Sequence, residues 1–226
     1  ALYIAEEGNK RICVASDKDE NITFGQAVHR NEFGITKGTF WSPSGHALAF
    51  YRMDETPVGD YPLVDISARQ AKLNNMKYPM AGMNSHHVTV GIFYPDTQKS
   101  VYLKTGAPRD RYFTNLAWSP DGNQLYIAEL NRDQDSCRLN VYDAQSGSLL
   151  RTLFTETHPK YVEPEHPVLF LKNNPDQFIW QSERDGFNHL YLYDTQGNLL
   201  RQLTQGEWVV TEVLGFDKTG RYLFYV

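Results

Sequence analysis

The chain repeats one pattern of polar and apolar positions, a tight turn followed by a short apolar run. The two clearest copies are residues 41–50 (WSPSGHALAF) and residues 118–127 (WSPDGNQLYI). In both copies proline fixes one backbone angle of the turn and glycine allows a conformation that other residues avoid, so the turn leads directly into a strand. Weaker copies begin at Leu171 and Phe216, and the run at Leu2 is a copy that lacks its turn.

The spacing of these copies predicts the fold class. The first apolar residue after each turn is Leu2, Leu48, Leu125, Phe178 or Leu223, at steps of 46, 77, 53 and 45 residues. Repeats in the forties that hold several short strands are typical of β-propeller blades. The sequence therefore predicts an all-β fold, a partial β-propeller over residues 1–226 with about four blades, two of them incomplete at the termini.

Within this frame, residues 1–25 are expected to supply the remaining strands of a first blade, ending at Ile22 and Thr23. Residues 25–34 (GQAVHRNEFG) show no alternation, so they predict a short helix between blades that ends at Gly34. The long step of 77 residues indicates an insertion at about residues 55–86. Loops of this length inside a compact repeat are usually functional or contact a partner.

The two ends of the chain suggest a fragment of a larger protein, because both fall inside a repeat. Unpaired strand edges at such ends could pair with each other or with a second copy. We therefore expect either an open arc of blades or a closure through the two ends.

Composition narrows the functional classes. The chain carries 22 Lys and Arg against 27 Asp and Glu, a net charge of −5 without a basic block, so a nucleic-acid partner is not expected. Cys13 and Cys137 lie in different repeats and predict two buried free thiols rather than a disulfide. The adjacent His86 and His87 point to opposite faces of a strand, and no further ligand lies at a suitable spacing, so neither a metal site nor a cofactor is expected.

Three stretches resemble a known family. They are residues 28–33 (VHRNEF) before 41–43 (WSP), residues 78–82 (YPMAG), and residues 180–190 (WQSERDGFNHL). With these motifs the whole chain resembles the propeller domain of the dipeptidyl peptidase IV branch of the prolyl oligopeptidase family, and its bacterial, Bacteroides-type members most of all. The resemblance implies an eight-bladed propeller in the parent protein, followed by an α/β-hydrolase domain with a Ser, Asp, His triad.

The resemblance also implies a function and site residues. Members of this family release dipeptides whose last residue is proline or alanine, and two glutamates of the propeller bind the free α-amine of the peptide. Glu32 matches the second of these glutamates, whereas Asn31 stands in place of the first. That difference keeps a prolyl tripeptidyl peptidase of the same family open as an alternative. Tyr161, in residues 158–164 (HPKYVEP), matches an aromatic wall of the substrate pocket.

Further expectations follow from the resemblance. They are a homodimer, in which the insertion resembles an arm that reaches a partner subunit, and a periplasmic, outer-membrane-associated or secreted location. The chain contains no Gly-x-Ser-x-Gly pentapeptide, so no catalytic residue is assigned to it and it is expected to be inactive alone. A propeller fold does not by itself imply an enzyme, and a non-catalytic binding or scaffold module is the second alternative.

Overall fold

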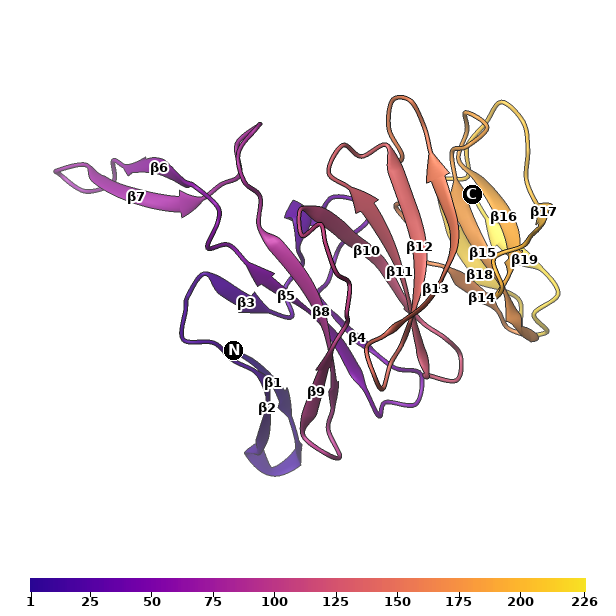
Figure 1. The fold of residues 1–226 in the computed structure, drawn as a ribbon, viewed down its shortest axis with the longest axis horizontal. Helices are drawn as coiled ribbons and strands as arrows, with labels where there is room; N and C mark the ends of the chain where they lie inside the picture. Colours follow the sequence, from indigo (N-terminus) through magenta and orange to yellow (C-terminus); the bar gives the residue numbers. More distant parts are fainter.

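The computed structural model describes residues 1–226 as antiparallel sheets that stand side by side in an arc (Figure 1). Three sheets are complete blades, and a two-stranded sheet lies at each end of the arc. The predicted all-β class is confirmed. No helix is long and apolar enough to cross a membrane.

The strand bounds follow the predicted repeat. The first sheet holds β1 (Leu2–Ala5) and β2 (Arg11–Ala15). The second blade holds β3 (Ile22–Phe24), β4 (Thr39–Trp41), β5 (Leu48–Asp54), β8 (His87–Tyr94) and β9 (Lys99–Tyr102). The third holds β10 (Arg111–Trp118), β11 (Gln124–Asn131), β12 (Ser136–Asp143) and β13 (Leu149–Thr157).

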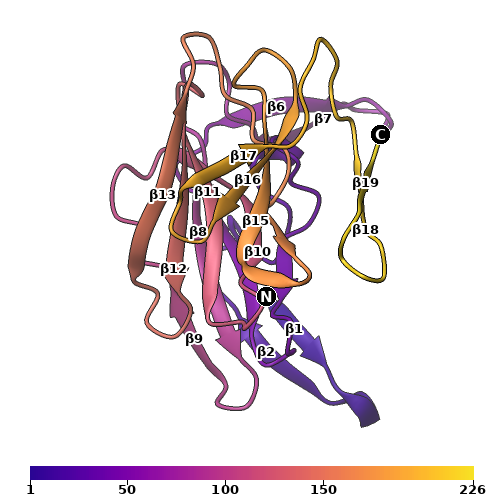
Figure 2. The ribbon, with the colours of Figure 1, turned by 90° about the vertical axis from the view of Figure 1, so that its right-hand side faces the viewer.

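The fourth blade holds β14 (Leu169–Leu171), β15 (Asn174–Ser182), β16 (His189–Asp194) and β17 (Leu199–Gln202). The last sheet holds β18 (Val213–Phe216) and β19 (Leu223–Tyr225). Two short 3-10 turns complete the elements, η1 (Glu7–Asn9) and η2 (His29–Asn31). The two end sheets remain separate from each other (Figures 1 and 2). Of the two expected arrangements, the structure therefore has the open arc and not the closure through the two ends.

The core lies between blades rather than inside one sheet. One buried cluster joins the second and third blades and includes Tyr51, Ile92 and Phe113. Another joins the third and fourth blades and includes Tyr126 and Trp180. Because a middle blade is covered on both faces, strands such as β11 are apolar at successive positions instead of alternating with polar ones.

The repeated serine of the turns has the same structural role in both clear copies. The Ser42 hydroxyl accepts the Ala47 N–H at 3.1 Å, and the Ser119 hydroxyl accepts the Gln124 N–H at 2.9 Å. The tryptophans before these serines differ, since Trp118 is buried but Trp41 is half exposed. The hydrogen bond of the turn is therefore the same in both copies, although the tryptophan before it belongs to the core in only one of them.

Two expectations about the first blade were wrong. Residues 22–24 do not belong to that blade, because β3 pairs with residues 52–54 of β5 in the second blade. Both cysteines are free as predicted, but only Cys137 is buried, whereas Cys13 is exposed on β2. Cys13 lies in a two-stranded sheet that covers less surface than a complete blade does.

The insertion between β5 and β8 forms a projecting hairpin, β6 (Asp60–Asp65) and β7 (Lys72–Lys77) (Figure 1). We call this hairpin the arm. Every residue of β6 is exposed, and several large apolar side chains of the arm are open to solvent, among them Val64, Ile66 and Leu73. Such exposure is typical of a surface that binds a partner.

Candidate functional site

The segment that carries Glu32 interrupts the first strand of the second blade. β3 and β4 both pair with β5, and residues 26–37 leave the sheet between them. The gap closes through Tyr51, whose carbonyl accepts the Gly25 N–H at 2.8 Å and whose N–H donates to the Gly38 carbonyl at 3.0 Å. We call this narrow base of the inserted segment, at Gly25 and Gly38, the neck. A Cβ at Gly38 would lie 2.0 Å from the carbonyl oxygen of Gln26, so the neck requires glycine at this position.

The inserted segment, residues 26–37, contains a left-handed turn where the sequence predicted a short helix between blades. His29, Arg30 and Asn31 have φ of 51°, 53° and 66°, and Phe33 has φ of 55°. Left-handed backbone costs about 1–2 kcal/mol per non-glycine residue, so tertiary contacts must hold this turn. The helix prediction was wrong because the conformation depends on those contacts and not on local helix signals.

Two buried histidines supply the main contacts of the turn. His29 Nε2 accepts the backbone N–H of Phe113 in the next blade at 3.2 Å. His29 Nδ1 therefore carries the ring proton and donates it to His86 Nε2 at 3.1 Å, and the backbone N–H of His29 also donates to that atom. Thr114 adds a hydrogen bond of 2.7 Å from its hydroxyl to the carbonyl of Phe33.

This arrangement requires both imidazoles to be neutral. Burial lowers the pKa of His29 well below its usual value, and repulsion from His86, when that ring carries a proton, and from Arg132 lowers it further. Burial, followed by the charges of Arg30 and Arg132, lowers the pKa of His86 to about 4. His86 thus positions the turn, and the structure shows no group of three His, Cys, Asp or Glu side chains that could hold a metal ion.

The inserted segment packs against residues 158–166, the loop between the third and fourth blades. A Cβ at Gly34 would lie 1.9 Å from the carbonyl oxygen of Glu165, and the Asn115 amide donates to the carbonyl of Pro164 at 2.7 Å. The close backbone contact brings Glu32 toward the glutamates of this loop. The inserted segment of the second blade thus contacts the loop that follows the third blade.

Four solvent-exposed glutamates, Glu32, Glu163, Glu165 and Glu183, lie close enough there for their charges to interact, and we call them the acidic cluster. Partial burial raises the pKa of the Glu163 carboxyl, and the charges of Glu165, Glu183 and Glu32 raise it further. None of the four takes part in an ion pair with Lys, Arg or His. A cation that enters the cluster relieves the repulsion between these carboxylates, so the cluster favours a positively charged ligand.

A cavity of about 260 Å³, which we call the acidic cavity, opens beside this cluster. Its lining includes Glu163, Glu183 and Tyr161, whose side chain is 51% exposed. Arg184 also lines it, but this guanidinium is paired with Glu156 and lies over the Tyr191 ring at 4.3 Å. Lys160 lines it as well and belongs to no ion pair, so two unpaired carboxylates face one unpaired ammonium and the net unpaired charge is negative.

The sequence-predicted site residues divide in two. Tyr161 lines the acidic cavity, whereas Glu32 is exposed and does not line it; the charge of Glu32 contributes only to raising the pKa of Glu163. Asn31 is exposed, makes no side-chain hydrogen bond, and is not among the residues that line this cavity. Sequence reasoning missed Glu163 and Glu183, although Glu183 lies in residues 180–190, which carried the family resemblance, and Glu163 lies two residues after Tyr161. Their role depends on contacts between blades that no local motif encodes.

The fold is an arc of propeller blades, and its acidic cavity is lined by the loop between the third and fourth blades and by residues 181–184 of the fourth blade. The chain belongs to the family of dipeptidyl peptidase IV (DPP IV) N-terminal regions, whose sequence profile it matches over residues 1–226. The resemblance found in the sequence is thus confirmed.

Solved structures agree with this assignment. A putative dipeptidyl aminopeptidase IV from Bacteroides ovatus is 50% identical with a TM-score of 0.89, over 93% of this chain and 32% of that chain. Dipeptidyl peptidase 4 from Porphyromonas gingivalis is 27% identical with a TM-score of 0.82, over 94% of this chain and 31% of that chain.

Curated relatives agree as well. A probable dipeptidyl-aminopeptidase B from Coccidioides posadasii is 27% identical over 239 residues, which are 94% of this chain and 26% of that protein. The chain therefore spans about a quarter to a third of the relatives it matches.

Proposed function

We propose that this chain is the substrate-binding propeller of a serine exopeptidase that removes Xaa-Pro and Xaa-Ala dipeptides from peptide N-termini. In this role the acidic cluster binds the free α-ammonium group, Tyr161 bounds the pocket, and the chemistry belongs to a hydrolase domain of the same protein. The names of the relatives support the dipeptidyl activity. The unpaired acidic cluster beside a cavity is the observation that carries the anchoring role.

The physical argument rests on charge and confinement. An ammonium group that leaves water needs anionic partners, and charge-assisted hydrogen bonds to carboxylates are about twice as strong as neutral ones. A fixed anchor also limits how many residues fit between the N-terminus and the bond that is cut, which explains why an exopeptidase needs one. Because Asn31 replaces one carboxylate, Glu163 and Glu183 supply the additional negative charge in this proposal.

Kinetics on the full-length protein test the proposal. We expect Glu32→Gln and Glu163→Gln to lower kcat/KM for a Gly-Pro anilide by roughly 10- to 150-fold, the value of one hydrogen bond to a charged group. Glu7→Gln, which removes an exposed carboxylate on η1, is the matched control and should change nothing. An N-acetylated Gly-Pro anilide should be a poor substrate for every variant.

The preferred length of the substrate distinguishes a dipeptidyl peptidase from a tripeptidyl peptidase. Faster cleavage of an Ala-Ala-Pro anilide than of the Gly-Pro anilide would indicate a tripeptidyl peptidase with the same anchor. Hydrolysis of neither anilide by the full-length protein would overturn the enzymatic proposal and favour a binding module.

We also propose that the arm binds a second subunit. An apolar cavity of about 450 Å³ lies along it and is lined by Tyr61, Met76 and Tyr78, together with Leu63, Met80 and Arg30. Arg30 of the inserted segment lies over the Tyr78 ring at 4.3 Å, so the arm contacts the segment that carries Glu32. Covering this apolar surface with a partner would stabilise the assembly.

A further inference from the structure

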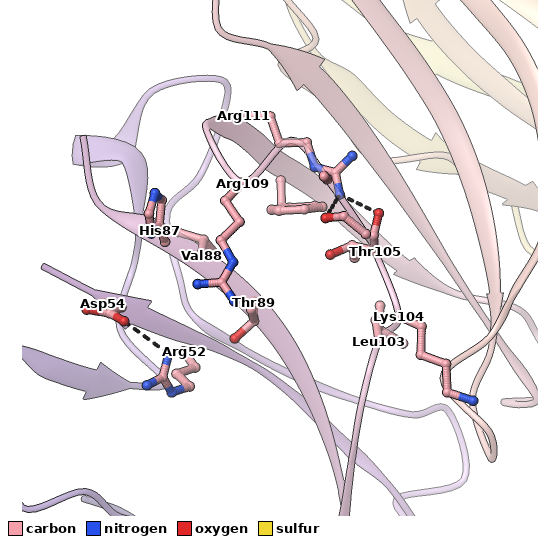
Figure 3. Close-up of a pocket in the computed structure, with 13 residues that line it drawn as sticks. Arg52, Asp54, His87, Val88, Thr89, Leu103, Lys104, Thr105, Arg109 and Arg111 are labelled. Carbon is pink, nitrogen blue, oxygen red and sulfur yellow. Dashed lines mark hydrogen bonds and ion pairs between the residues drawn. The ribbon is translucent and has the colours of Figure 1, made fainter. Parts of the chain in front are cut away.

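A second cavity, with the opposite charge, lies between the second and third blades. It measures about 400 Å³ and is bounded by β5, β8, β10 and the loop that follows β9 (Figure 3). We call it the basic cavity. Its volume is within the range of small-molecule sites in proteins. Its charged and titratable lining residues are Arg52, Asp54, His87, Lys104, Arg109 and Arg111.

The basic cavity has more positive than negative charge although the chain as a whole has a net charge of −5. Arg52 pairs with Asp54 at 3.7 Å, and Arg111 pairs with Glu129 at 3.1 Å. Arg109, by contrast, belongs to no ion pair. Lys104 is also outside any ion pair, but its ammonium donates to the Ser148 hydroxyl at 3.2 Å and points away from Arg109 (Figure 3). One cationic group that faces the cavity, the guanidinium of Arg109, therefore lacks an anionic partner.

Hydrogen-bonding capacity is also unused at this cavity. The Thr89 hydroxyl and the Nε–H of Arg111 are buried without a hydrogen-bond partner, and both residues line the cavity. Arg109 points into the cavity toward Thr89 (Figure 3). Buried polar atoms are normally satisfied, so unpaired ones beside an unpaired cation indicate a ligand that accepts hydrogen bonds.

The loop after β9, which forms one wall of the cavity, is held in place before any ligand binds. The Arg111 side chain is only 10% exposed and donates to the carbonyl oxygens of Thr105 and Gly106 at 2.5 and 3.1 Å. These bonds hold the loop that carries Arg109. A preorganised loop reduces the entropy that binding must overcome.

We propose that the basic cavity binds a phosphate-type oxyanion, either inorganic phosphate or the phosphate group of a small ester. A tetrahedral oxyanion accepts several hydrogen bonds at once, which matches the guanidinium of Arg109 and the hydroxyl of Thr89. Arginine binds such groups through two parallel hydrogen bonds. The site is independent of the acidic cluster and of the proposed peptidase function.

Isothermal titration calorimetry of the full-length protein with inorganic phosphate at low ionic strength tests this site. We expect saturable binding to one site per chain. Arg109→Gln should weaken it about tenfold or more, and Thr89→Val should weaken it as well. Lys99→Gln, which removes an exposed cation on β9 outside the cavity, should leave it unchanged.

Parallel titrations with a sugar phosphate and with succinate identify the source of the anion. A sugar phosphate that binds more tightly than inorganic phosphate assigns the site to an ester, and the reverse order assigns it to the free ion. Tighter binding of succinate would overturn the phosphate assignment. The absence of saturable heat, or an equal loss in Lys99→Gln, would overturn the site itself. Circular dichroism checks the fold of each variant.

Discussion

Acidification should loosen the turn that presents Glu32, because that turn depends on two neutral histidines. The pKa of His86 is about 4 in the folded protein, against 6.5 for an unperturbed histidine. The pKa of His29 is lowered as well. Below pH 6.5 the opened state takes up protons that the folded state does not bind. Stability is therefore complete above pH 6.5 and is lost as the pH falls toward 4.

The magnitude follows from the linkage between proton binding and opening. Each histidine contributes at most about 1.4 kcal/mol per pH unit in this window. For His86 alone, lowering the pH from 7 to 5 should reduce the free energy of opening by about 2 kcal/mol, or about 30-fold in the opening equilibrium. His29 increases the effect.

Hydrogen exchange of the full-length protein, followed by mass spectrometry, measures this opening locally. After correction for the intrinsic exchange rate, peptides that cover residues 26–36 should lose about 30-fold in protection between pH 7 and pH 5. His86→Gln should show a smaller pH dependence, with the remainder due to the buried His29, whereas the exposed His46→Gln serves as the control. Unchanged protection in the wild type, or an equal acid response in His86→Gln, would refute this reasoning.

Three further predictions concern the neck, the blade contact and the arm. Gly38→Ala should destabilise the protein by about 1–3 kcal/mol, because its methyl group meets a backbone carbonyl, and thermal denaturation should show a lower Tm. Tyr51→Phe removes a hydrogen bond of 2.9 Å to the Phe113 carbonyl and should cost about 1–3 kcal/mol by the same assay; an unchanged Tm would contradict either expectation. Replacing the exposed Ile66 and Leu73 of the arm with lysine should weaken the proposed dimer of the full-length protein about 100-fold in sedimentation equilibrium, and an unaltered dimer would exclude the arm as the interface.

The strands of the blades could largely be predicted from the sequence because turn chemistry and apolar runs are local signals. The segments at residues 2–5 and 48–54 are strands as expected. The pairing of β3 could not be predicted, since it has three residues and its partner, residues 52–54, lies beyond the inserted segment. A long-range pairing of this kind leaves no periodic pattern.

The candidate site could be predicted only in part. Glu32 and Tyr161 were identified by resemblance to the family, not by a physical signal in the chain. The left-handed turn depends on His86 and on the backbone of the next blade, both distant in sequence. Likewise, Glu163 joins Glu32 only because blades stand side by side. The charge of the site is thus a property of the tertiary structure.

The central claim is that the acidic cluster holds the N-terminus of a peptide. A crystal structure of the full-length protein with the dipeptide Gly-Pro tests it most directly. We predict that the ammonium nitrogen lies about 3 Å from carboxylate oxygens of Glu32 and Glu163, with Tyr161 beside the peptide. An ammonium group that contacts neither glutamate would contradict the account.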